Sequence, residues 1–119
     1  MEFGFKKEHD LLRQMLEEFT KNEVYPLAAE IDELERFPIE TVKKMKDAGI
    51  MGIPFPEKYG GEGGDYLGYI LAVEEISKAC ATTGVVLSGH TSLCAQPIYE
   101  YGTRSEERRV GKECFVPCR

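Results

Sequence analysis

The chain has 119 residues, of which 42% are hydrophobic and 30% are charged, and its formal net charge is -6. This length fits one domain that buries roughly two thirds of the surface its unfolded chain would expose, and the composition is that of a soluble globular protein rather than a disordered or fibrous one. The negative charge and the lack of a basic stripe argue against binding to nucleic acid, whose phosphates require clustered Lys and Arg.

The N-terminal residues and the cysteines indicate where in the cell the protein is expected and whether it binds a metal. The segment from Met1 to Glu8 lacks the basic stretch and apolar run of a secretory signal, so we expect a cytoplasmic protein. The four cysteines are then expected to be thiols rather than disulfides. No Cys or His spacing resembles a zinc site, and we predict no bound metal.

The first half of the chain predicts three amphipathic helices. Apolar residues recur at helical spacing from Leu11 to Phe19 and again from Val24 to Leu34, with charged residues between them. Because Pro26 interrupts the second stripe, the first helix is expected to kink there or to restart with this proline in its first turn. Pro38 opens the third helix, and Gly49 is placed to end it in a left-handed conformation.

A glycine-rich loop, residues 60–64, separates these helices from the rest. It lacks the Gly-Lys-Ser/Thr ending of a P-loop and the G-x-G-x-x-G spacing of a dinucleotide-binding turn, so a flexible turn is the favoured interpretation. Asp65 is predicted to cap a fourth helix whose buried face runs from Tyr69 to Cys80. Thr82-Thr83-Gly84 is expected to break that helix and to cap a fifth.

The fifth predicted helix, Val85 to about Tyr101, is the least charged part of the chain. The stretch from Ala79 to Tyr99 contains no Asp, Glu, Lys or Arg, so its surface is expected to be sheltered from water. Its Ser, Thr, Gly, Gln and Pro residues make it too polar to predict a membrane span. Gly89 and Pro97 would let a ligand or another segment approach closely. No strand-like alternation occurs, so the prediction is an all-α bundle of about five helices.

Several motifs carry a resemblance to a known family. In chain order the motifs are AGIMGIP at 48–54, PEKYGG at 56–61, VEEISKACATTG at 73–84, HTSLC at 90–94 and YGT at 101–103. Together they resemble the N-terminal helical domain of acyl-CoA dehydrogenases, and most closely that of the bacterial short-chain, butyryl-CoA type. The resemblance covers residues 1–103.

The resemblance implies a flavoprotein oxidoreductase of fatty acid metabolism that removes two hydrogens from the α and β carbons of a short-chain acyl-CoA. In this family a carboxylate takes the α proton, the β hydrogen leaves as hydride to FAD, and the electrons pass to an electron-transferring flavoprotein. The catalytic glutamate and most flavin contacts belong to later domains. The chain is therefore expected to contain no catalytic or cofactor-binding residue, to be inactive alone, and to form part of a homotetramer when full length.

The resemblance also implies that the fifth helix lines the buried end of the acyl slot. The matching positions are Val85, Ser88, Gly89 and Leu93, whose small or apolar side chains suit a hydrocarbon chain. Simple packing within the bundle is the alternative role for these four residues. His90 is expected to be structural, because no carboxylate partner lies near it in the sequence.

The resemblance ends after Thr103. Residues 104–119 carry five Lys or Arg and three Glu and do not follow the family, so we expect an atypical, non-native tail attached to an N-terminal domain at residues 1–103.

Two other functions stay open. One is a non-catalytic α-helical interaction module that presents its fifth helix to a partner, and the other is the same domain from an acyl-CoA oxidase.

Overall fold

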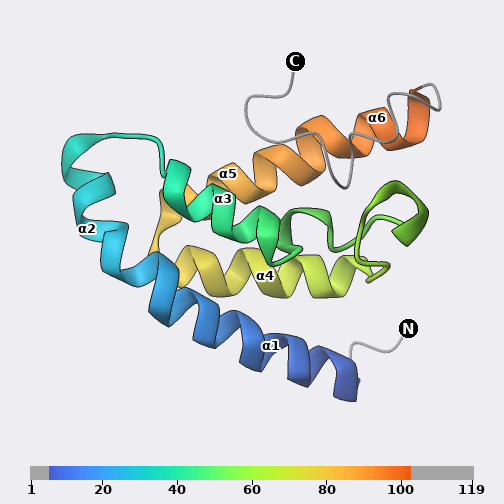
Figure 1. Ribbon diagram of the computed structural model, residues 1–119, viewed down its shortest axis with the longest axis horizontal. Coiled ribbons are helices and arrows are strands. Elements are labelled where there is room, and N and C mark those ends of the chain that lie inside the picture. The colour runs from blue at the N-terminus through green and yellow to red at the C-terminus, as the bar shows by residue number, and fades with distance from the viewer. Residues whose placement is uncertain (1–5, 103–119) are drawn as a thin grey trace.

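In a computed structural model, residues 6–102 are described, and within this range the chain forms helices and loops without strands (Figure 1). This confirms the predicted all-α fold. Two pairs of α-helices run on through a π-helical turn, so the described residues form four continuous helical rods. The elements are α1 (Lys7–Phe19), η1 (Thr20–Val24), α2 (Tyr25–Leu34), α3 (Ile39–Asp47), η2 (Ile50–Gly52), η3 (Glu57–Tyr59), α4 (Tyr66–Ala79), α5 (Ala81–Ser88), η4 (Gly89–Ala95) and α6 (Gln96–Tyr101).

The two π-helical turns, η1 and η4, share a local cause. In each, the backbone N–H of the next residue donates to the carbonyl five residues back, from Tyr25 to Thr20 and from Gln96 to Thr91. A proline follows directly in both cases. A proline inside an α-helix has no N–H to donate and clashes with the carbonyl four residues back, and the wider turn accommodates it. Pro26 thus lies in the first turn of α2, as expected.

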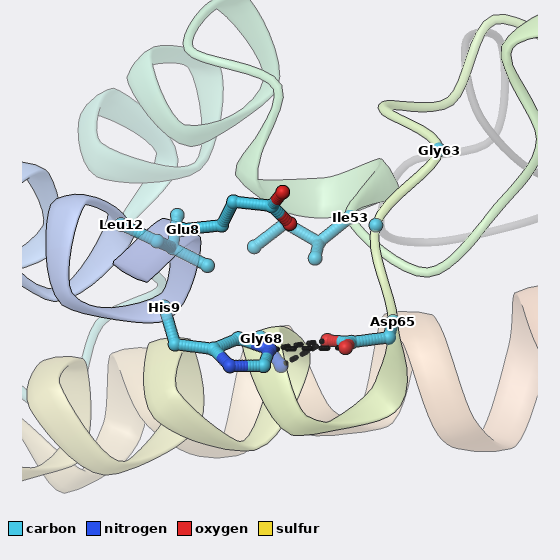
Figure 2. Close-up of a pocket in the computed structure, with 8 residues that line it drawn as sticks. Glu8, His9, Leu12, Ile53, Gly63, Asp65 and Gly68 are labelled. Atoms are coloured by element: carbon cyan, nitrogen blue, oxygen red, sulfur yellow. Dashed lines mark hydrogen bonds and ion pairs between the residues drawn. The ribbon is translucent and has the colours of Figure 1, made fainter. Parts of the chain in front are cut away.

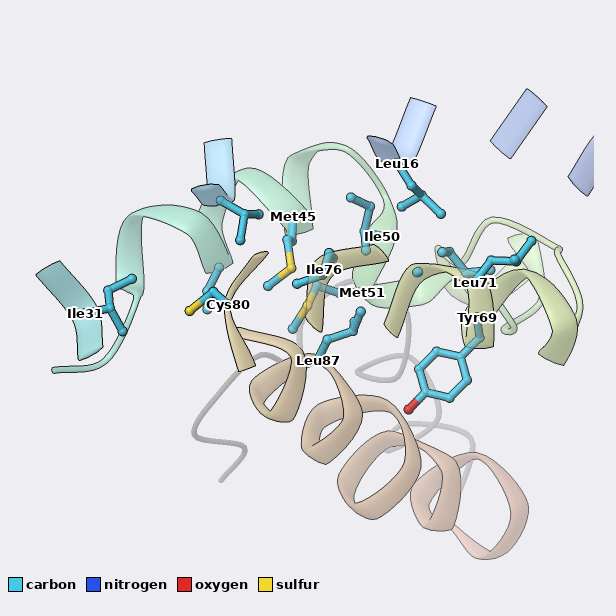
Figure 3. Packing of buried hydrophobic residues seen from close by; sticks show 14 residues of the cluster. Leu16, Ile31, Met45, Ile50, Met51, Tyr69, Leu71, Ile76, Cys80 and Leu87 are labelled. Atoms are coloured by element: carbon cyan, nitrogen blue, oxygen red, sulfur yellow. The ribbon is translucent and has the colours of Figure 1, made fainter. Parts of the chain in front are cut away.

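The main core lies where the rods meet. Figure 3 shows Leu16 from α1, Met45 from α3, Ile76 from α4 and Leu87 from α5 pointing toward one another, all fully buried. Helix α4 lies between α1 and α5 and packs against both (Figure 1). Each such side chain contributes about 1.5–3 kcal/mol by leaving water. The bundle therefore holds the rod from α5 to α6 against α4.

The turn between α4 and α5 corrects one expectation. Helix α4 ends at Ala79, Cys80 alone is extended with φ -152° and ψ 108°, and α5 begins at the next residue. The predicted break at residues 82–84 is therefore wrong, because these residues lie inside α5. Gly84 is there because the helices approach closely: a Cβ at this position would lie 2.0 Å from Oγ of Ser77.

The glycine-rich loop is ordered by backbone hydrogen bonds rather than being the flexible turn we expected. The N–H of Gly63 donates to the Phe55 carbonyl at 2.8 Å, and the N–H of Gly64 donates to the Ile53 carbonyl at the same distance. A Cβ on Gly61 would lie 2.3 Å from the carbonyl oxygen of Phe55. Glycine is required because two stretches of backbone meet here.

A small aromatic cluster fixes this loop to the far end of the last rod. The ring of Phe55 lies 5.8 Å from that of Tyr99, and Tyr59 meets Tyr99 edge-on at 6.0 Å. Phe55 and Ala95 are both fully buried in this cluster. Such aromatic pairs stabilise a fold by about 0.5–1.5 kcal/mol beyond the effect of their buried area. The cluster therefore holds the far end of the rod, while the main core holds its near end at α5.

Candidate functional site

The four residues predicted to line an acyl slot lie along one side of the rod formed by α5 and η4. Val85 and Leu93 are 70% and 79% exposed, and Ser88 and Gly89 between them are half-buried. Val85, Gly89 and Leu93 follow each other at intervals of four residues, which places them on neighbouring turns of the helix. We call this exposed, uncharged surface of Val85, Ser88, Gly89 and Leu93 the outer face.

No contact within the described residues explains why position 89 of the outer face is a glycine. Its backbone is helical, with φ -62° and ψ -42°, and a Cβ built there meets nothing within 4 Å. Gly84 in the same rod, by contrast, is needed for a close helix approach. A glycine inside a helix costs about 1 kcal/mol relative to alanine. The open space above Gly89 is therefore available to a group beyond the described residues.

A polar pair beneath the outer face was not predicted from the sequence. The hydroxyl of Tyr69 lies 2.7 Å from Oγ of Ser92 and 3.5 Å from the carbonyl oxygen of Ser88. We expected Tyr69 only as part of the buried face of α4, and it is indeed 5% exposed. The missed signal is that a buried tyrosine hydroxyl usually finds a polar partner.

His90 points away from the outer face into the core. It is 1% exposed, and its Nδ1 lies 3.4 Å from Oγ1 of Thr91, which donates to the carbonyl of Met51 at 3.4 Å. These contacts hold η4 against the η2 segment. They support the structural role that we expected for this histidine.

A second polar site lies at the start of α1 and α4, in a pocket of about 220 Å³ (Figure 2). Nδ1 of His9 accepts a hydrogen bond from the N–H of Lys6 at 3.0 Å, so Nε2 carries the proton and faces the Asp65 carboxylate at 2.9 Å. Asp65 also accepts from the N–H of Gly68 at 2.8 Å, which confirms it as the cap of α4. The Gly68 amide, followed by His9, lowers the pKa of Asp65. These contacts tie two helix starts together.

Residues 6–102 also bear on metal binding and on insertion into a membrane. No group of three or more His, Cys, Asp or Glu side chains in this range is arranged to hold a metal ion. None of the helices formed by these residues combines the length and the apolar character needed to cross a membrane.

Comparison with known proteins identifies the family. Residues 6–113 match the family described as acyl-CoA dehydrogenase, N-terminal domain, and the chain belongs to it. The match runs past residue 103, so the boundary that we placed there stays a prediction. The chain is 61% identical over 109 residues to the short-chain specific acyl-CoA dehydrogenase of Clostridium acetobutylicum, a match that covers 92% of this chain and 29% of that protein.

Solved structures agree on the fold and the family. One similar chain comes from a solved structure described as the electron transferring flavoprotein of Acidaminococcus fermentans. It matches with a TM-score of 0.88 and 39% identity, and the match covers 94% of this chain and 30% of that one. Butyryl-CoA dehydrogenase from Megasphaera elsdenii matches with a TM-score of 0.82 and 35% identity, covering 92% and 29%. The chain thus spans less than a third of the length of these relatives.

Proposed function

We propose that this chain is the N-terminal part of an FAD-dependent acyl-CoA dehydrogenase that desaturates short-chain acyl-CoA thioesters between the α and β carbons. Its contribution is to form one wall of the acyl slot with the outer face of α5 and η4. Membership of the family and the 61% identity to a short-chain specific enzyme support this activity. By family, the electron acceptor is an electron-transferring flavoprotein, and the full-length enzyme is a homotetramer. We further propose that it is cytoplasmic.

The open space above Gly89 is the observation that carries the proposal. Val85 and Leu93 flank it with exposed apolar side chains, and the outer face bears no charge. A preformed, mostly apolar wall with room beside a glycine suits a hydrocarbon chain. Its residues exclude water from the acyl chain and limit how far the chain extends.

FAD supplies the hydride acceptor when it is bound. The described residues fit a role in the acyl wall and not at the phosphates of FAD, because the amides of Gly61, Gly63 and Gly64 donate to carbonyls of their own loop. By family, the carboxylate base and most contacts to the flavin lie in parts of the enzyme beyond this chain. The outer face orients the acyl chain toward them.

The test uses a hybrid enzyme in which residues 6–102 replace the matching stretch of the Clostridium acetobutylicum enzyme. In this hybrid, Gly89→Leu fills the space and is expected to lower kcat/KM for hexanoyl-CoA relative to butyryl-CoA by about tenfold, since one or two methylenes are worth that much in an apolar pocket. Leu93→Ala is expected to shift the same ratio in the opposite direction. Matched controls are Ala29→Leu and Leu34→Ala, which change exposed residues of α2.

Two results would contradict the proposal. One is a hybrid that binds FAD but does not oxidise butyryl-CoA. The other is an unchanged hexanoyl to butyryl ratio in both Gly89→Leu and Leu93→Ala at full flavin content, which would leave the outer face as ordinary surface.

A further inference from the structure

We infer that Tyr69 sets the acyl-chain selectivity of this enzyme by anchoring the π-helical turn η4 from behind the outer face. The inference rests on the proposed function, because it concerns the position of the proposed acyl wall. Tyr69 would act as a positioning residue, since its side chain is buried beneath the wall and holds the residues that form it.

The contacts of Tyr69 lead directly to the outer face. Its side chain extends from α4 toward the rod of α5 and η4, hydroxyl foremost (Figure 3). That hydroxyl reaches Oγ of Ser92 at 2.7 Å and lies 3.5 Å from the carbonyl oxygen of Ser88. Ser88 directly precedes Gly89, and Ser92 directly precedes Leu93. The hydroxyl of one buried tyrosine therefore holds the neighbours of two residues of the outer face, Gly89 and Leu93.

Both hydroxyls are satisfied by one arrangement. When the Tyr69 hydroxyl donates to the Ser88 carbonyl at 3.5 Å, Ser92 can donate to the Tyr69 oxygen at 2.7 Å. Removing the tyrosine oxygen takes away this link between η4 and α4, while Ser92, which is exposed, can bond water instead. Because Tyr69 is buried and its hydroxyl is costly when unpaired, the pair favours the one register of η4 that brings these atoms together.

The register matters because η4 is a π-helical turn. Such turns are rare, occur as local bulges inside α-helices, and are frequent at functional sites. Successive residues of an α-helix are rotated by about 100° about its axis, so a shift of one residue in the register of η4 would rotate Leu93 relative to α4 and change where its side chain lies on the outer face. The proline at position 97 favours the wide turn from one end, and Tyr69 holds it at its middle.

The experiment compares four variants of the hybrid enzyme, Tyr69→Phe, Ser92→Ala, their combination, and the control Tyr66→Phe. Tyr66 is a suitable control because it is an exposed tyrosine of the same helix. Tyr69→Phe is expected to raise the ratio of kcat/KM for hexanoyl-CoA over butyryl-CoA by about threefold to tenfold, the loss that one hydrogen bond implies. Ser92→Ala should shift it the same way, and the double variant no further, because both remove one interaction. Tyr66→Phe should leave the ratio unchanged.

The outcomes separate this inference from the function on which it rests. If Gly89→Leu changes the ratio but Tyr69→Phe and Ser92→Ala do not, the acyl wall stands and the role of Tyr69 is refuted. If none of the three changes it, both ideas fail. If Tyr69→Phe lowers flavin content, melting temperature and both kcat/KM values together at a constant ratio, Tyr69 only supports the fold. If Tyr69→Phe does not fold, Ser92→Ala still tests the contact between Tyr69 and Ser92, because Ser92 is exposed and its replacement leaves the core intact.

Discussion

Asp65 makes two kinds of contact at once. Its carboxylate caps α4 through the N–H of Gly68 and also accepts from Nε2 of His9, which belongs to α1. Asp65 and His9 are 56 positions apart in the sequence, whereas Gly68 is three positions from Asp65. The capping role follows from residue type and position, so it could be predicted. The bond to His9 could not, because it depends on how α1 packs along α4.

Replacement of Asp65 by alanine is expected to lower the free energy of unfolding by about 0.5–2 kcal/mol at neutral pH, the usual cost of losing an N-cap. The Gly68 amide and then His9 lower the pKa of Asp65. Stabilisation by the carboxylate is therefore present above the usual Asp pKa and is lost as the pH falls through the lowered value. Urea unfolding at a series of pH values should show the variant approaching the parent chain in acid. The control is Asp32→Ala, which changes an exposed residue in the last turn of α2, and an equal loss in both variants would refute the capping role.

Single residues of the outer face could be named from the sequence only through family resemblance. The structure adds that Val85 and Leu93 are exposed and that Gly89 faces open space. The pair of Tyr69 and Ser92 was missed because the π-helical register changes which residues of two helices meet. Composition and spacing do not record that register.

At the scale of elements, the amphipathic stripes predicted the helices, while local propensity misplaced the turn between α4 and α5. Residues 82–84 have poor helix propensity, yet they continue α5 because Gly84 packs against Ser77. Tertiary packing thus overrides a weak local preference. Cys80, which has no turn-forming character, is the residue that is extended.

The close approach at Gly84 gives a prediction with a matched control in the same rod. Gly84→Ala is expected to lower the free energy of unfolding by about 1–3 kcal/mol, because its Cβ would overlap Oγ of Ser77 and the helices must separate. Gly89→Ala should instead raise it by up to about 1 kcal/mol, since its Cβ meets nothing and alanine favours the helix. Urea unfolding monitored by circular dichroism at one protein concentration compares the two. A change of the same sign in both would contradict this account of the two glycines.

On the scale of the whole molecule, the rod from α5 to α6 carries more exposed apolar surface than its sequence led us to expect. We predicted that the uncharged stretch is sheltered from water, yet Val85, Leu93 and Tyr101 are among the most exposed large hydrophobic residues of the described range. The relatives are more than three times as long as this chain. In the proposed enzyme, the substrate and the remaining domains would cover this surface.

The 119-residue chain alone is therefore expected to self-associate through the outer face. Contiguous exposed apolar surface of this kind marks an interface or an aggregation site. Substituting both Val85 and Leu93 by serine should shift the chain toward monomer in sedimentation velocity and reduce binding of a hydrophobic dye, because it removes the exposed apolar side chains. Serine at Leu11 and Leu34, which are exposed on α1 and α2, serves as the control and should change neither measurement. A parent chain that is already monodisperse, melts cooperatively and binds no dye would show that the outer face does not drive association.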